Sequence, residues 1–209
     1  NEEDKTYENE SSRDRYYAAA VTYNNGGLSL YGAVDVLNKA SFGTNNTADT
    51  EDNQITITAA VNYDCGFAKS YLGVHWFDNA KAVGSSSFGG DWGRMGNFKE
   101  DNGDPIHSGF GDANGWSVML GVDIPVGNGK VKTTLGYLDA SSDNKGSETD
   151  DVDQDLKRFM VGAGYEYYLS KRTTVYMGAG YLQDSIDTAK GNSYDPSWVQ
   201  VNCGLKHKF

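Results

Sequence analysis

Hydrophobic and polar residues alternate along much of the chain, most regularly in its last stretch. One parity of residues 197–209 is mainly apolar and contains Val199, Val201, Cys203, Leu205, His207 and Phe209. The other parity is polar or small and contains Gln200, Asn202, Gly204, Lys206 and Lys208. A period of two predicts a β-strand with one apolar and one polar face.

The same alternation recurs upstream and predicts nine strands in all. They cover about residues 14–24, 26–37, 53–64, 67–78, 115–126, 130–140, 155–169, 172–184 and 196–209. Helical spacing is not sustained over a useful length, so the chain is predicted to be all-β. No window approaches the roughly 20 apolar residues that a transmembrane helix needs.

The connections between these strands alternate between short and long. Tight hairpin links are predicted at 24–26, 64–66, 126–129 and 169–171. Long loops are predicted at about 38–52, 79–114, 141–154 and 185–195. Short turns at one rim and long loops at the other are typical of a transmembrane antiparallel β-barrel. A soluble β-sandwich would mix the lengths and need crossover connections.

An odd number of strands leaves the barrel open. The first and last strands run in the same direction, so they cannot pair antiparallel with each other, and an open edge in lipid is costly. We therefore expect residues 14–209 to supply the C-terminal nine strands of a larger barrel, with residues 1–13 the remnant of an extracellular loop. A complementary N-terminal barrel segment would supply the other strands, on another chain or from a nicked precursor.

The net charge of −11 comes mainly from acidic residues in the predicted loops. Nucleic-acid binding is disfavoured, because a phosphate backbone needs a basic patch. One interpretation of the acidic residues is that they are simply solvated in the loops. The other is that divalent cations bridge them, either within a loop or to the anionic head groups of outer-membrane lipid and lipopolysaccharide. The densest cluster is Asp150, Asp151, Asp153 and Asp155. It lacks the spacing of a calcium loop, and we expect no specific metal and no cofactor.

The two cysteines lie in different parts of the predicted sheet. Cys65 falls in a tight turn and Cys203 in the middle of the last strand. A disulfide needs Cα atoms within about 7 Å of each other, so we expect both thiols to be free.

Candidate pore-lining residues share the polar parity of the strands. They are Lys69, His75, Lys130, Lys132, Arg158, Glu166, Arg172 and Lys206. Rings of charged side chains on a pore wall select ions by their field. Lys69, Lys130, Lys132 and Arg158 are the foremost candidates for tuning charge preference, although a wet wall also tolerates polar residues without such a role. Neutralising Arg158 and Lys130 together is expected to shift the reversal potential toward cations.

Aromatic residues gather on the apolar parity near strand ends. Those predicted to sit at the membrane interface are Tyr63, Trp76, Trp116, Tyr165, Tyr167, Tyr181 and Phe209. Amphipathic rings are enriched at that depth of a bilayer.

Two motifs carry a family resemblance. YEYYLSKRTTVYMGAGY at 165–181 and VNCGLKHKF at 201–209 resemble the tyrosine-rich strand, Leu-Ser-Lys-Arg-Thr turn and closing strand of the general trimeric porins of Gram-negative proteobacteria. The resemblance implies a sixteen-stranded barrel, of which nine strands are present here, in the bacterial outer membrane. It also implies a homotrimer and passive diffusion of small hydrophilic solutes and ions. The chain departs from the family in lacking the N-terminal strands and the constriction loop that follows them.

Two other classes of barrel remain as alternatives. One is an adhesin or structural outer-membrane protein closed by its own side chains. The other is an outer-membrane hydrolase using His107 with Asp104 and Ser108, but three such residues arise easily by chance in a loop rich in Gly and Asp. We expect no catalytic residue, and conductance in a planar bilayer distinguishes a channel from both alternatives.

Overall fold

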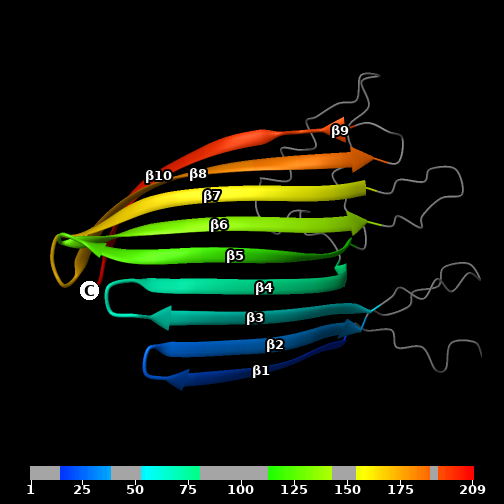
Figure 1. The fold of residues 1–209 in the computed structure, drawn as a ribbon, viewed down its shortest axis with the longest axis horizontal. Coiled ribbons are helices and arrows are strands. Elements are labelled where there is room, and N and C mark those ends of the chain that lie inside the picture. The colour runs from blue at the N-terminus through cyan, green and yellow to red at the C-terminus, as the bar shows by residue number, and fades with distance from the viewer. Residues whose placement is uncertain (1–14, 39–52, 81–112, 143–153, 189–192) are drawn as a thin grey trace, which may run out of the picture.

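The computed structural model describes residues 15–38, 53–80, 113–142, 154–188 and 193–209 (Figure 1). These segments form one antiparallel sheet, in which each long strand lies beside the long strand that precedes it in sequence. Its strands are β1 Arg15–Asn25, β2 Leu28–Asn38, β3 Gln54–Asp64, β4 Lys69–Ala80, β5 Ala113–Val126, β6 Gly129–Ser142, β7 Gln154–Tyr168, β8 Thr173–Thr188, β9 Ser193–Tyr194 and β10 Ser197–His207. No helix among the described residues is long and apolar enough to cross a membrane.

All nine long strands predicted from alternation are present, but the loop predicted at 185–195 is partly wrong. β8 continues to Thr188, and β9 pairs with its end. The reason is the partner strand: Leu156 of β7 lies opposite Ile186, so the ladder continues where the sequence turns polar. The loop predicted at 79–114 is also shorter at both ends, since β4 reaches Ala80 and β5 begins at Ala113. Residues 1–13 lie outside the described part of the chain.

The short turns all lie at one end of the sheet, on the left of Figure 1. Three of them contain a glycine with positive φ, namely Gly26 at 56°, Gly66 at 88° and Gly127 at 58°, a conformation that tight hairpin turns require. The fourth turn instead uses the hydroxyl of Ser170, which accepts hydrogen bonds from the backbone of Arg172 and Thr173. We call this end of the sheet the turn rim.

The register divides the sheet into an apolar face and a polar face. Most of the large exposed hydrophobic side chains of the strands lie on the apolar face, for example Ile57, Leu120 and Val201. The exceptions on the polar face are Tyr16, Tyr31, Met119, Tyr168 and Tyr176. A sheet that exposes one whole apolar face needs an apolar environment to cover it.

Among the described residues, the buried hydrophobic side chains form a small cluster at the end opposite the turn rim. They are Phe77, Ala80, Ala113, Ala140, Leu156 and Ile186. The register joins three of them across neighbouring strands, with Leu156 opposite both Ala140 and Ile186. The described part of the sheet is therefore stabilised mainly by its strand ladders, with this cluster at one end.

Both cysteines are free, as predicted. Cys65 lies in the β3–β4 turn, where its thiol donates a hydrogen bond to the carbonyl oxygen of Ala68 at 3.0 Å. Cys203 lies on the apolar face of β10. Both side chains are exposed in the described structure.

Close packing at one glycine gives a prediction about stability. A Cβ atom added to Gly129 would overlap the carbonyl oxygen of Glu166 and lie 2.8 Å from the hydroxyl of Tyr165. Gly129→Ala should lower the free energy of unfolding in detergent by about 1–3 kcal/mol, the usual cost of overpacking. Gly73→Ala is the matched control, because a Cβ at Gly73 meets no atom within 4 Å. Equal urea midpoints for the two variants would contradict the packing argument.

Candidate functional site

The polar face brings together most of the charged residues predicted to line a pore. Lys69, His75, Lys130, Lys132, Arg158, Glu166 and Lys206 all lie on it. The remaining residue of that set, Arg172, lies in the turn between β7 and β8. Sharing a face is what a common wall requires, and their role in solute passage stays a prediction.

Two ion pairs lie on the polar face near the turn rim. The ammonium group of Lys130 lies 3.0 Å from Asp123 Oδ2, and that of Lys132 lies 2.9 Å from Glu166 Oε1. The hydroxyl of Tyr71 also donates to Asp123 Oδ2, at 3.3 Å. The register sets Lys132 opposite Asp123 and Lys130 opposite Glu166, so both ion pairs run diagonally between strands. Long side chains commonly reach such diagonal neighbours.

A third ion pair is buried near the other end of the sheet. Arg158 Nε donates to Asp184 Oδ1 at 2.6 Å, and Arg158 Nη2 donates to Asp184 Oδ2 at 2.7 Å. The guanidinium carbon also lies 5.3 Å from the centre of the Trp198 ring. Asp184 is fully buried. The bidentate geometry satisfies both carboxylate oxygens, which is what a buried carboxylate requires.

These ion pairs change which residues are expected to give the polar face its electric field. Of the four residues first in line to tune charge preference, Lys130, Lys132 and Arg158 each have a carboxylate partner. Lys69 lies over the ring of Tyr71 at 5.4 Å. A close pair of opposite charges acts on a passing ion much less than a single charge at the same distance. Sequence parity identified the basic partners but did not single out Asp123 and Asp184.

Between the ion pairs lies an apolar depression of about 410 Å³. Its polar-face lining includes Ala60, Gly73, Met119, Gly136 and Met160. The Met160 side chain lies directly against Gly136, where a Cβ would come within 2.8 Å of its Cε. The middle section of the polar face is thus lined mainly by small and apolar side chains, with ion pairs on either side of it.

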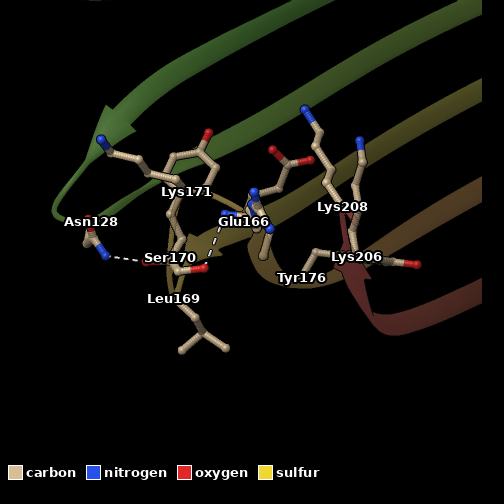
Figure 2. Close-up of a pocket in the computed structure, with 11 residues that line it drawn as sticks. Asn128, Glu166, Leu169, Ser170, Lys171, Tyr176, Lys206 and Lys208 are labelled. Carbon is tan, nitrogen blue, oxygen red and sulfur yellow. Dashed lines mark hydrogen bonds between the residues drawn. The ribbon is translucent and has the colours of Figure 1, made fainter.

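A second depression, of about 650 Å³, opens at the turn rim (Figure 2). It lies between the β7–β8 turn and the end of β10, and four basic side chains line it, namely Lys171, Arg172, Lys206 and Lys208. Arg172 and Lys206 belong to the predicted set. We call this depression the rim pocket.

The aromatic residues predicted for a membrane interface lie mainly on the apolar face. Tyr63, Trp76, Trp116, Tyr165, Tyr167 and Tyr181 are all on it, whereas Phe209 follows the end of β10. Trp76 and Trp116 lie directly opposite each other, and the hydroxyl of Tyr165 donates to the Val126 carbonyl at 2.9 Å. Tyr63, Tyr165 and Tyr167 lie toward the turn rim, whereas Trp76 and Trp116 lie toward the other end of the sheet. Amphipathic rings suit a boundary between lipid and water, and this role stays a prediction.

Some candidates lie outside the described residues. These include His107, Asp104 and Ser108, which carried the hydrolase alternative, and Asp150, Asp151 and Asp153 of the acidic cluster. In the part of the chain that the structure describes, no group of three or more His, Cys, Asp or Glu side chains could hold a metal ion.

Comparisons with known proteins agree on one fold. A family model described as Gram-negative porin matches residues 1–187. The solved anion-selective porin from Comamonas acidovorans matches with a TM-score of 0.58 and 24% sequence identity, over 93% of this chain and 49% of that chain. The chain thus spans about half the length of that porin. A search of curated proteins found no match.

Proposed function

Since the chain belongs to the Gram-negative porin family of the bacterial outer membrane, we propose that the polar face of its sheet lines part of a water-filled channel. Small hydrophilic solutes and ions would diffuse through this channel passively. Such transport uses the shape and field of the wall and needs no catalytic residue.

The observation that carries the proposal is the separation of the two faces over the whole sheet. Most of the exposed apolar side chains lie on one face, while most of the charged and small residues lie on the other. In a transmembrane barrel the apolar face meets lipid and the polar face surrounds water. The same arrangement in a soluble protein would leave a large apolar surface in water.

The open edges support a complementary barrel segment as partner. Among the described residues, β1 pairs only with β2, and β10 pairs with β8 alone. Both edge strands run toward the turn rim, so antiparallel closure needs an odd number of further strands. A barrel of about sixteen strands fits the family, and we propose that it assembles as a homotrimer. The polypeptide inventory of the native particle decides whether a second chain or a longer precursor supplies the missing strands.

Cysteine scanning of two neighbouring threonines tests the channel proposal. Thr134 lies on the polar face of β6 and Thr133 on the apolar face, and the hydroxyl of each donates to a carbonyl of β5, that of Leu120 and that of Val122 respectively. The background carries Cys65→Ser and Cys203→Ser, so that the introduced cysteine is the target. A charged methanethiosulfonate reagent should then change the single-channel conductance of Thr134→Cys by more than the spread between individual openings. The same reagent should leave Thr133→Cys unchanged, because lipid excludes it.

Each outcome of that experiment has a clear meaning. Absence of conductance steps from the unsubstituted native assembly would overturn the channel proposal. Modification of Thr133→Cys but not Thr134→Cys would reverse the assignment of the faces. Liposome swelling in neutral sugars then measures the passage of uncharged solutes independently of ionic current.

A further inference from the structure

The rim pocket concentrates positive charge at one end of the polar face. Lys171, Arg172, Lys206 and Lys208 line it, and Glu166 is its only acidic lining residue within the described structure. Glu166 is already engaged, since its Oε1 lies 2.9 Å from the ammonium of Lys132. Four of the charged side chains that line the pocket are therefore positive, and the one lining carboxylate is already paired with Lys132.

Backbone contacts fix the two sides of the pocket relative to each other. The amide of Lys208 donates to the carbonyl of Arg172 at 2.9 Å, which ties the end of β10 to the β7–β8 turn. The turn is itself held by Ser170 Oγ, which accepts from the amides of Arg172 at 3.1 Å and Thr173 at 3.0 Å. The cationic side chains thus extend from a defined backbone rather than from a long loop.

Lys206 of β10 and Lys208, which lies just after β10, point to a common side. Figure 2 shows Lys206 and Lys208 extending together toward the side where the Glu166 carboxylate lies, with Lys171 at the other end of the pocket. Register sets Lys206 opposite Thr174 of β8, on the polar face. A neutral polar group, the Asn128 amide, also lines the pocket. Clustered cations with few counter-charges favour a ligand that carries several negative charges at once.

We propose that the rim pocket binds small multivalent anions, such as tricarboxylates or short polyphosphates, at the turn-rim end of the channel. This inference rests on the proposed channel function, because the pocket is a solute site only if the polar face surrounds water. The free volume of about 650 Å³ accommodates a small solute with its remaining hydration. A chloride ion meets one or two of the cations at most, whereas a multivalent anion contacts Lys206 and Lys208 together.

Tripolyphosphate is the probe that tests the site. Added to the native assembly in a planar bilayer, it should reduce the chloride current in a saturable way. The double variant Lys206→Gln/Lys208→Gln should raise the half-blocking concentration by about tenfold, since it removes two exposed charge contacts that each contribute a factor of about three. Lys157→Gln is the matched control, because Lys157 belongs to β7 but lies on the apolar face. It removes one charge without touching the pocket.

The outcomes separate this inference from the channel proposal. Conducting channels whose block is the same in the double variant and the unsubstituted protein would overturn the rim site while leaving the channel intact. An anionic lipid headgroup offers the same phosphate chemistry as a soluble polyphosphate. Repeating the titration in bilayers without anionic lipid should leave the half-blocking concentration unchanged. A large fall there would show that lipid headgroups occupy the pocket and compete with the probe, which would assign the pocket to lipid and overturn the solute site.

Discussion

Asp184→Ala is expected to lower the free energy of unfolding by about 3–5 kcal/mol, because it leaves the guanidinium of Arg158 without its buried carboxylate. Asp184 is fully buried and accepts two hydrogen bonds from Arg158, at 2.6 and 2.7 Å. Urea unfolding in detergent or lipid vesicles measures the loss. Trp198 lies 5.3 Å from the same guanidinium, so its fluorescence reports the transition locally once the other three tryptophans are replaced by Phe.

Glu166→Gln provides the matched control for this prediction. It removes a carboxylate from an ion pair of similar length, with Lys132 at 2.9 Å, but both side chains of that pair are partly exposed. Exposed pairs contribute about 0–1 kcal/mol, so the control should unfold close to the unsubstituted protein. Equal losses for the two variants would show that burial does not determine the strength of these pairs.

A double-mutant cycle isolates the interaction from its surroundings. Replacing both Arg158 and Asp184 by apolar residues removes the charges together, and should recover much of the loss, since an apolar replacement of a buried pair is often neutral. A double variant as unstable as the sum of the single variants would mean that Arg158 and Asp184 act independently. That result is incompatible with the bidentate geometry in the structure.

Alternation along the sequence predicted the strands because the sheet has unlike faces throughout. It failed at residues 185–188, where SIDT resembles a polar loop although β8 continues through it. The sequence of β8 alone does not show its partner strand. Leu156 of β7 lies opposite Ile186, and this pairing extends β8 through the polar residues. Burial of Asp184 is equally invisible in a single strand, since it depends on side chains from neighbouring strands.

The ion pairs illustrate what could have been predicted about the site. In the β7–β8 hairpin each residue pairs with the one equally far from Lys171 on the other side. The predicted turn at 169–171 is centred on Ser170 and would have set Arg158 opposite Leu182, so the pairing of Arg158 with Asp184 follows only from the observed register. The diagonal pairs Lys130–Asp123 and Lys132–Glu166 were beyond such a rule, because the choice between opposite and diagonal neighbours depends on side-chain rotamers.

Lys206→Glu/Lys208→Glu is expected to increase the cation-to-anion permeability ratio of the channel about fifteenfold. At roughly 8 Å in water a unit charge contributes about 0.5 kcal/mol, which screening at 0.1 M salt reduces to about 0.2 kcal/mol. The double variant changes the wall by four unit charges, which act with opposite sign on cations and anions. The ratio therefore changes by about 1.6 kcal/mol, or about fifteenfold. The reversal potential in a potassium chloride gradient measures it.

The matched control removes an ion pair at the same rim. Lys130→Gln/Asp123→Asn deletes two opposite charges whose atoms lie 3.0 Å apart, so the net charge of the wall is unchanged. Lys206 and Lys208, by contrast, form no ion pair within the described structure. Because a close pair acts as a dipole, the control should leave the reversal potential nearly unchanged while the glutamate variant shifts it toward cations. A large shift of the reversal potential in the control, with none in the glutamate variant, would contradict this prediction. It would mean that the Lys130–Asp123 ion pair determines charge preference and that Lys206 and Lys208 do not.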